Sequence, residues 1–248
     1  MNVVRIYEVG ISGSTVIGAY LAGRTRNAIH NGEAVRVDRP SLIKANPVCT
    51  CGVNILECPF WKSIDRDGYR VAVKSIASKG YSTVIDSSKS SEIPTVDGVD
   101  VIPIHLVKDP RASTWSWFRT REIVNPAGMK ETLKKVSWLD LPKVILSTYK
   151  NFIKFRIRNY PLIRYERFCR EPDVYLRQIL SKMNLAIEDS RPYSQESNHG
   201  VGGNVARYGL DGTLNAESKW KEEASLIYQW AVSIAYLPML VWIRWGSR

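Results

Sequence analysis

The sequence has little of several features that define common protein classes. It contains four cysteines in 248 residues, which is too few for a disulfide framework. Its first residues lack the long apolar stretch and small-residue cleavage site of a secretory signal, so we expect a cytoplasmic chain. It has neither a long run of Lys and Arg nor a basic stripe interleaved with aromatic residues, so we expect no nucleic acid as a partner.

What the chain does contain is typical of one globular domain with an anionic partner. Hydrophobic residues make up 44% of the sequence and charged residues 24%, and its 16 Gly and 12 Pro are dispersed. We therefore expect one domain spanning residues 1–248. The 35 Lys and Arg outnumber the 24 Asp and Glu, and the resulting net charge of +11 favours ligands that carry phosphate or sulfate.

Short apolar runs alternate with helical patterns in the first two thirds of the sequence. Residues 3–9, 83–85 and 101–107 read as strands, residues 15–21 read as a helix, and residues 162–167 have room for one more strand. This recurrence predicts an α/β fold with a central parallel sheet of four to five strands flanked by helices. Further helices are expected over residues 60–79, over residues 127–149 with Pro142 breaking or kinking the helix, and over residues 173–183.

Two polar segments and one apolar segment complete the expected organisation. Residues 39–60 form a cysteine-containing loop insert, and residues 188–214 form a long loop near a site. Residues 215–248 form a helical C-terminal segment, within which residues 225–243 carry no charge over a length that could nominally span a bilayer.

The uncharged segment 225–243 has two interpretations. One is a tail anchor or interfacial helix, which would make the chain peripheral to a membrane. The favoured one is a buried terminal helix packed on the sheet, because the segment contains an apolar stripe at helical spacing, made of Leu226, Trp230, Ile234, Leu237 and Val241.

A loop rich in Gly and Ser, Gly10 to Thr15, lies between the first expected strand and helix. Backbone N–H groups at such a helix start converge on one point, and the helix dipole adds positive potential there. The loop lacks the lysine of a Walker A motif, and its glycines do not have the dinucleotide-binding spacing. It is P-loop-like and suits a phosphate or sulfate, although an ordinary Gly/Ser turn would look the same in isolation.

Seven segments together resemble, in order and spacing, the sulfotransferases that use 3′-phosphoadenosine-5′-phosphosulfate. They are SGST (12–15), NGE (31–33), CTCGVNILECPFW (49–61), VIDSSK (84–89), HLVKDPRASTWSW (105–117), RYE (164–166) and HGVGGNVAR (199–207). The cysteine-bearing segment resembles an insert common in bacterial members. The resemblance covers roughly residues 3–210 and implies that fold, that donor nucleotide and a hydroxyl-bearing acceptor.

The resemblance also implies roles for individual residues. Ser12, Gly13, Ser14 and Thr15 correspond to the loop that holds the 5′-phosphosulfate. Lys108 and Ser116 correspond to the residues that bind the 3′-phosphate, with Lys in place of the usual Arg. Tyr165 corresponds to a tyrosine near the nucleotide, and Arg207 to a late basic residue that reaches its phosphates.

The catalytic residues follow from the same resemblance. Glu33 corresponds to a base that takes the acceptor proton, although as an isolated residue it would be read as a surface carboxylate. Ile11 stands where many members carry Lys or Arg, and we expect Lys89 to supply the missing positive charge. Asp86 is expected to accept hydrogen bonds from backbone or loop hydroxyls rather than to organise a metal. Arg111 is expected to pair with nearby carboxylates.

The cysteines and histidines suggest no further chemistry. Cys49, Cys51 and Cys58 could bind zinc with a fourth ligand, but their spacing lacks the paired C-x2-C of well-known zinc sites, so no metal is expected. His105, inside an expected strand, is read as a core residue. His30 and His199 lie near the site motifs, and their roles stay open.

The resulting functional prediction is a sulfotransferase that transfers a sulfuryl group to a hydroxyl of a small-molecule, lipid or carbohydrate acceptor. One alternative is a catalytically impaired nucleotide-binding protein of the same fold, which Ile11 favours. Another is a P-loop kinase-like phosphotransferase, which would depend on Mg²⁺. Residues 126–138 and 149–160 are candidates for the acceptor pocket, although aromatic residues at helical spacing more often belong to the core.

Overall fold

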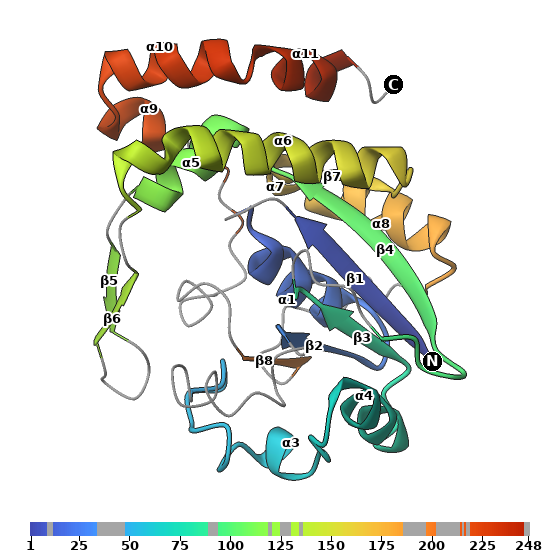
Figure 1. Cartoon of the computed structure of the whole chain (residues 1–248). Coiled ribbons are helices and arrows are strands. Elements are labelled where there is room, and N and C mark those ends of the chain that lie inside the picture. Colours follow the sequence, from blue (N-terminus) through green and yellow to red (C-terminus); the bar gives the residue numbers. More distant parts are fainter. Residues whose placement is uncertain are drawn as a thin grey trace.

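The computed structural model describes most of the chain. The described residues are 1–8, 12–33, 48–88, 94–118, 121–124, 130–133, 136–185, 197–201, 214, 216 and 219–245. In this part, a parallel sheet is flanked by helices, as the sequence predicts (Figure 1).

The central sheet has six strands in the order β7-β4-β1-β3-β2-β8. Their bounds are β1 Asn2–Glu8, β2 Ala28–Gly32, β3 Thr83–Asp86, β4 Asp100–Val107, β7 Leu162–Arg164 and β8 Asn198–Val201. Every neighbouring pair is parallel. The α/β fold is thus confirmed, but the sheet is larger than the four to five strands expected from sequence.

The additional strands are β2 and β8, and both are short and polar. Strand β2 has the sequence AIHNG and β8 the sequence NHGV, so neither shows the apolar run by which strands are recognised. Strand β8 lies within residues 188–214, which were expected to form only a loop. Pairing in the sheet gives the backbone N–H and C=O groups of both strands hydrogen-bond partners, and this outweighs the weak preference of their residues for strand structure.

Alternation along β1 directs its side chains to the two faces of the sheet. Val4 and Ile6 pack with residues of α1 (Ser14–Arg24) and α8 (Pro172–Lys182), whereas Val3 packs with residues of α4 (Tyr69–Ser78). Because both faces are covered, β1 is buried almost throughout, as expected for a central parallel strand.

The helix predicted over residues 60–79 is interrupted. Helix α3 (Pro59–Lys62) ends after one turn, and α4 begins only at Tyr69. Between them Gly68 has φ 89°, a positive value that a continuing right-handed helix cannot contain, and Asp65 accepts a hydrogen bond from the backbone of Asp67.

The helix predicted over residues 127–149 was wrong in its first half. Strands β5 (Arg121–Val124) and β6 (Lys130–Leu133) form a separate antiparallel pair. The short helix η2 (Trp138–Asp140) then leads into α6 (Leu141–Ile157). Pro142 lies in the first turn of α6, where its missing N–H costs nothing, so it starts this helix rather than breaking it.

Strand β7 is shorter than residues 162–167, because α7 (Tyr165–Arg170) begins immediately after Arg164. The helix expected over residues 173–183 is confirmed as α8.

The aromatic stretch 149–160 belongs mainly to α6, where Phe155 is fully buried against Tyr7 and His105. Two aromatic residues of this stretch, Phe152 and Phe155, therefore belong to the core.

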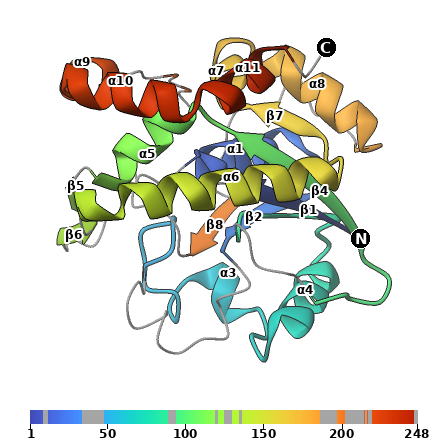
Figure 2. The same cartoon turned by 45° about the horizontal axis from the view of Figure 1, so that its top comes forward.

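The C-terminal segment contains α9 (Lys219–Glu223), α10 (Leu226–Ala235) and α11 (Leu237–Trp245). Helices α10 and α11 pack mainly against α6 and α5 (Pro110–Phe118), beside which they lie in Figures 1 and 2, and they reach the sheet only at its β4 and β7 side, through Val107 and Leu162. Tyr228, Val232, Tyr236 and Met239 make the buried contacts.

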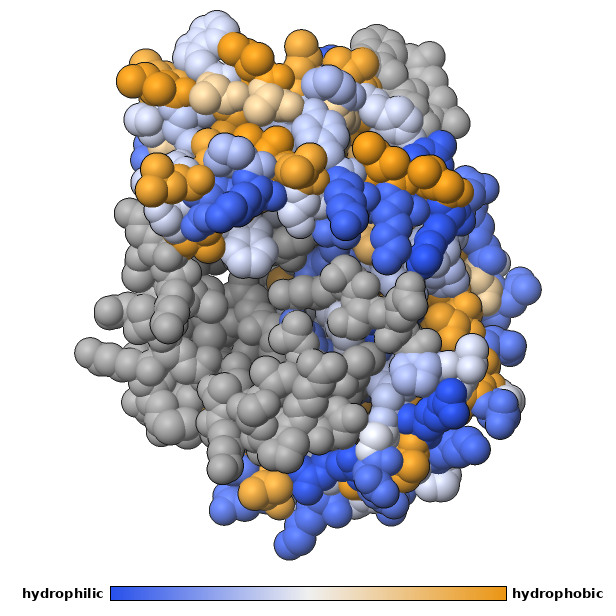
Figure 3. Space-filling view, in the orientation of Figure 1, coloured by the Kyte–Doolittle hydropathy of each residue, from blue (hydrophilic) through white to orange (hydrophobic). Residues whose placement is uncertain are grey.

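The stripe predicted to be buried in this segment is instead exposed. The side chains of Leu226, Trp230, Ile234, Leu237 and Val241 are 50–72% exposed. The segment is apolar on more than one side, so spacing alone could not identify its buried face. Figure 3 shows hydrophobic residues gathered over the upper part of the molecule, which contains α10, α11 and α6.

Within the described residues, no single helix is both long and apolar enough to cross a bilayer. Helices α10 and α11 reach that length and composition only as a pair, and the pair is bent by 69°.

Candidate active site

The parallel arrangement of the sheet gathers several predicted site residues at one edge. Because all six strands run in the same direction, their carboxyl ends share that edge. The phosphate loop follows β1, Glu33 follows β2, Lys108 follows β4 and Tyr165 follows β7. After β3 the chain crosses β1 to form β4, so the strand order reverses beside the phosphate loop. Such a reversal is where open α/β sheets form their ligand crevice.

The phosphate loop is held by a glycine in a left-handed conformation. Gly13 has φ 88° and caps the N-terminus of α1, and its carbonyl accepts a hydrogen bond from Ile17. A Cβ atom built on Gly13 would lie 2.3 Å from Cε2 of Tyr165, so the ring rests directly on the glycine backbone. Only glycine fits both this conformation and this approach.

Lys108 completes the group around the loop. Its Nζ lies 5.1 Å from the centroid of the Tyr165 ring, close enough for a cation–π contact. A cavity of about 10 Å³ lies between Ser12 and Lys108 and has room for about one water molecule. The loop, the tyrosine and the lysine, which are separated widely in sequence, are therefore neighbours.

Glu8 is a residue of this group that the sequence did not single out. It is buried at the end of β1, and its carboxylate accepts a hydrogen bond of 3.2 Å from the backbone N–H of Ser14. A negative charge at a helix N-terminus is favourable, so Glu8 occupies part of the position that a bound anion would use. An acidic residue at the end of the strand that precedes the phosphate loop was the available signal.

Glu33 lies at the end of β2 and is 2% exposed, rather than on the surface. Its backbone N–H donates to the carbonyl of Val201 in β8 at 2.9 Å, and the preceding Gly32 has φ 67°. A Cβ atom on Gly32 would lie 2.6 Å from the backbone of Val201, so the close approach of the two strands requires glycine. Strand β8 thus fixes the backbone that carries Glu33.

Asp86 accepts hydrogen bonds, as predicted. Its carboxylate receives Nη1 of Arg5 at 2.8 Å, the hydroxyl of Tyr69 at 3.0 Å, and both the backbone N–H and the hydroxyl of Ser88. Arg5 and Asp86 are both fully buried and form an ion pair, which the sequence did not reveal. These contacts fix the turn after β3 and account for Asp86 without a metal.

Arg111 pairs with a carboxylate, as predicted. Its guanidinium donates to both oxygens of Asp109, with a shortest distance of 2.8 Å, and lies over the ring of Trp220. The backbone N–H of Asp109 donates to Glu166 at 2.8 Å, and burial raises the pKa of Glu166. These contacts fix the turn that carries Lys108.

Ser116 lies in α5 and is buried, and its hydroxyl donates to the carbonyl of Ala112 at 2.9 Å. A serine hydroxyl has a single proton, so donation to a phosphate would require Ser116 to rotate and give up this bond.

The histidines near the sheet are core residues. His30 contacts the side chains of Asn198 and Ser87, at 2.9 and 3.2 Å, and burial lowers its pKa to about 4. His105 packs against Phe152 and Phe155, and burial likewise lowers its pKa to about 4. Both rings are therefore neutral at physiological pH. His30 connects neighbouring strands through hydrogen bonds, and His105 fills space between aromatic side chains.

Four residues named in the sequence analysis lie outside the described residues. They are Gly10, Ile11, Lys89 and Arg207. Ser88, which directly precedes Lys89, is anchored by Asp86 at the carboxyl end of β3.

Comparisons with known proteins gave matches among solved structures but none among family models or curated sequences. No protein-family model matches the sequence, and no curated protein sequence matches it. Among solved structures, the chain is similar to the mouse sulfotransferase SULT7A1 complexed with PAP, with a TM-score of 0.47 and 9% identity over 95% of this chain and 83% of that one.

Proposed function

We propose that the chain is a sulfotransferase that uses 3′-phosphoadenosine-5′-phosphosulfate. The observation that carries the proposal is the contact of Gly13, Tyr165 and Lys108 at the carboxyl edge of the sheet. These residues come from three motifs whose order along the chain resembles the order found in that family. The motifs can be recognised from the sequence alone, so their proximity in the structure is a separate observation.

The geometry supports a nucleotide site with two anionic groups. In the proposal, the 5′-phosphosulfate binds at the N-terminus of α1 through the backbone of Ser12, Gly13, Ser14 and Thr15. It displaces the carboxylate of Glu8 from the N–H of Ser14, because both cannot accept the same proton. The 3′-phosphate binds Lys108, together with Ser116 and Arg207.

The chemistry proposed for the site is an in-line displacement at sulfur. The acceptor hydroxyl loses its proton to the carboxylate of Glu33, and its oxygen forms a bond to sulfur. The bond between sulfur and the bridging oxygen breaks, and the electron pair leaves with the 5′-phosphate of adenosine 3′,5′-bisphosphate. Lys89 stabilises the charge that grows on this leaving group.

The first test is calorimetry with 3′-phosphoadenosine-5′-phosphate in the presence of EDTA. We expect metal-independent binding that Lys108→Ala weakens by about tenfold or more, since a charge-assisted contact contributes about 1.5–3 kcal/mol. Lys79→Ala is the matched control, because Lys79 is exposed at the end of α4, away from this edge. No binding by the folded wild-type chain would overturn the proposal.

The second test is turnover with labelled donor and a panel of hydroxyl-bearing acceptors. Glu33→Gln should abolish transfer and leave nucleotide affinity within a few-fold, whereas Glu57→Gln, at an exposed position, should leave both unchanged. Binding without transfer to any acceptor would favour the impaired nucleotide-binding protein. Activity that requires Mg²⁺ and a nucleoside triphosphate would favour a kinase-like phosphotransferase.

A further inference from the structure

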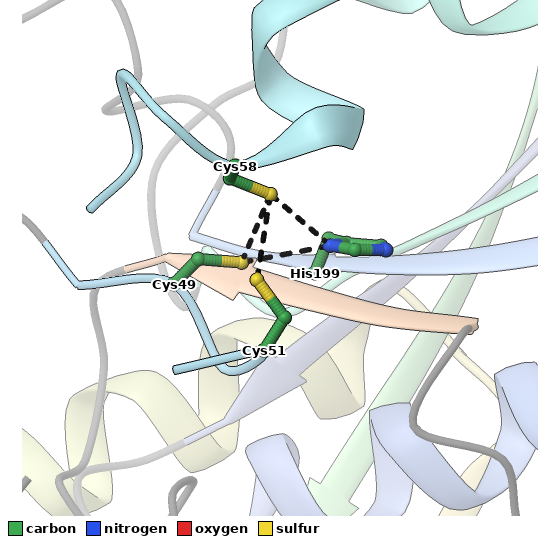
Figure 4. A group of neighbouring side chains, drawn as sticks. All are labelled: Cys49, Cys51, Cys58 and His199. Atoms are coloured by element: carbon green, nitrogen blue, oxygen red, sulfur yellow. Dashed lines mark hydrogen bonds between the residues drawn. The ribbon is translucent and has the colours of Figure 1, made fainter. Parts of the chain in front are cut away.

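Three cysteines and one histidine form a cluster beside β8. Cys49, Cys51, Cys58 and His199 each offer one ligand atom, and all four atoms lie within 4.8 Å of one another. Figure 4 shows the three thiols and the imidazole pointing toward a common centre. The sequence identified the cysteines, but His199 follows Cys58 by 141 residues, so no local spacing could reveal it as the fourth member.

Four of the six distances between ligand atoms in the cluster are close to those of a tetrahedral metal site. Zinc–sulfur bonds of about 2.3 Å and zinc–nitrogen bonds of about 2.0–2.1 Å place two sulfurs about 3.8 Å apart, and a sulfur and a nitrogen about 3.6 Å apart. Here Sγ of Cys58 lies 3.5 Å from Sγ of Cys51 and 3.7 Å from Sγ of Cys49. Nδ1 of His199 lies 3.6 Å from Sγ of Cys49 and 3.3 Å from Sγ of Cys58.

The backbone around Cys49 and Cys51 forms a tight turn that brings both thiols into the cluster. Gly52 has φ 94°, and its N–H donates to the carbonyl of Cys49 at 2.9 Å. The N–H of Cys49 in turn donates to Val53 at 2.9 Å. A glycine with positive φ directly after the second cysteine allows the chain to reverse so that the two sulfurs lie close together.

The other two ligands are also held by the surrounding chain. The N–H of Cys58 donates to the carbonyl of Asn54 at 2.7 Å. The ring of His199 stacks on Phe60 with a centroid distance of 4.7 Å, and the carbonyl of His199 accepts a hydrogen bond of 2.8 Å from Trp61. A preorganised imidazole beside three converging thiols is what a soft, four-coordinate cation requires.

We propose that Cys49, Cys51, Cys58 and His199 bind one zinc ion in a closed structural site. Four protein ligands of the Cys₃His type satisfy zinc without an open position for substrate. Binding replaces the three thiol protons, which pass to solvent, by bonds to the metal. A disulfide uses only two of these sulfurs and makes no use of the imidazole, so it explains the cluster less well.

The proposed zinc connects the cysteine-bearing loop to the sheet next to Glu33. Thr50, between two of the cysteines, donates its N–H to Gly200 at 3.1 Å and its hydroxyl to Asn198 at 2.5 Å, both in β8. Strand β8 pairs with β2 and accepts the N–H of Glu33. The ion therefore stabilises the edge strand that supports the predicted base, and it takes no part in the reaction.

The test is the metal content of the purified full-length chain, measured by mass spectrometry of the elements after growth with zinc. We expect about one zinc per chain, and its loss in Cys58→Ser. The matched control is Cys169→Ser, because Cys169 lies outside the cluster and its replacement should leave the zinc in place. Zinc retained in Cys58→Ser, or lost equally in Cys169→Ser, would refute the assignment.

A second measurement uses the wild-type chain alone and covers the case in which Cys58→Ser does not fold. Cobalt substituted for zinc should give the intense visible bands of tetrahedral coordination and a thiolate charge-transfer band, and added zinc should remove both. A folded wild-type chain with less than about 0.1 metal ions, or with a mass that reveals a disulfide, would overturn the proposal. Neither result depends on sulfotransferase activity.

Discussion

The contact between Gly13 and Tyr165 gives a quantitative test of the proposed nucleotide site. Replacing Gly13 with alanine adds one methyl group at a position with φ 88°, where an L-residue costs about 1–2 kcal/mol. The new Cβ would also lie 2.3 Å from the ring of Tyr165, which must retreat by about 1 Å to restore an ordinary contact of 3.4 Å. Overpacking of this kind costs about 1–3 kcal/mol, so we expect Gly13→Ala to lose about 2–5 kcal/mol of unfolding free energy.

Gly98→Ala separates the two contributions. Gly98 has φ 74°, and a Cβ added there would meet no atom within 4 Å, so its substitution carries the backbone cost alone. Urea unfolding should therefore show Gly13→Ala to be about 1–3 kcal/mol less stable than Gly98→Ala. In a Tyr165→Ala background, Gly13→Ala should cost about as much unfolding free energy as Gly98→Ala does, because the ring that it would overpack is gone. A double-mutant cycle measures this coupling directly.

The same variants test function. Calorimetry with 3′-phosphoadenosine-5′-phosphate should show at least about tenfold weaker binding in Gly13→Ala, because displacement of the ring disturbs both the loop and Lys108. Gly98→Ala should bind normally. Equal unfolding free energies for the two single variants would refute the close packing, and unchanged affinity in Gly13→Ala would refute its place in the nucleotide site.

Three further predictions concern stability and surface behaviour. Asp86→Asn should lose about 3–5 kcal/mol in urea unfolding because it removes the charge that pairs with the buried guanidinium of Arg5, whereas exposed Asp97→Asn should change stability by less than about 0.5 kcal/mol. The pKa of His30 and of His105 is about 4 in the folded chain and 6.5 in the unfolded chain, so the unfolded state takes up protons first. Unfolding free energy should therefore decrease as pH falls from 6.5 toward 4, and a pH-independent value would contradict this. Finally, we propose that the exposed stripe on α10 and α11 associates weakly with anionic vesicles, in which case Trp230→Ser should reduce co-sedimentation.

The parts of the fold that the sequence predicted are those with a strong local signal. Strands β1, β3 and β4 are apolar runs, and α1 and α8 have clear helical patterns, so their positions agree within a few residues. Strands β2 and β8 are polar and short, and only their pairing makes them strands. The buried stripe of α10 was misassigned because apolar residues cover several sides of that helix.

The candidate site shows the same division. The motifs around Gly13, Lys108 and Tyr165 were found because their order and spacing resemble those of the sulfotransferases. Glu8 and Arg5 were not found, because their roles depend on burial and on partners distant in sequence. His199 likewise acquires its neighbours only when β8 joins the sheet.

The position of β8 at the edge of the sheet has a consequence for the order in which the chain folds. Its contact with β2 joins residues separated by 168 positions, so this pairing is among the last that a growing chain can make on the ribosome. Until then β2 presents an unpaired strand edge, which is a template for association with other chains. A nascent chain stalled before Asn198 would therefore be prone to aggregate, even though five of the six strands had already been synthesised.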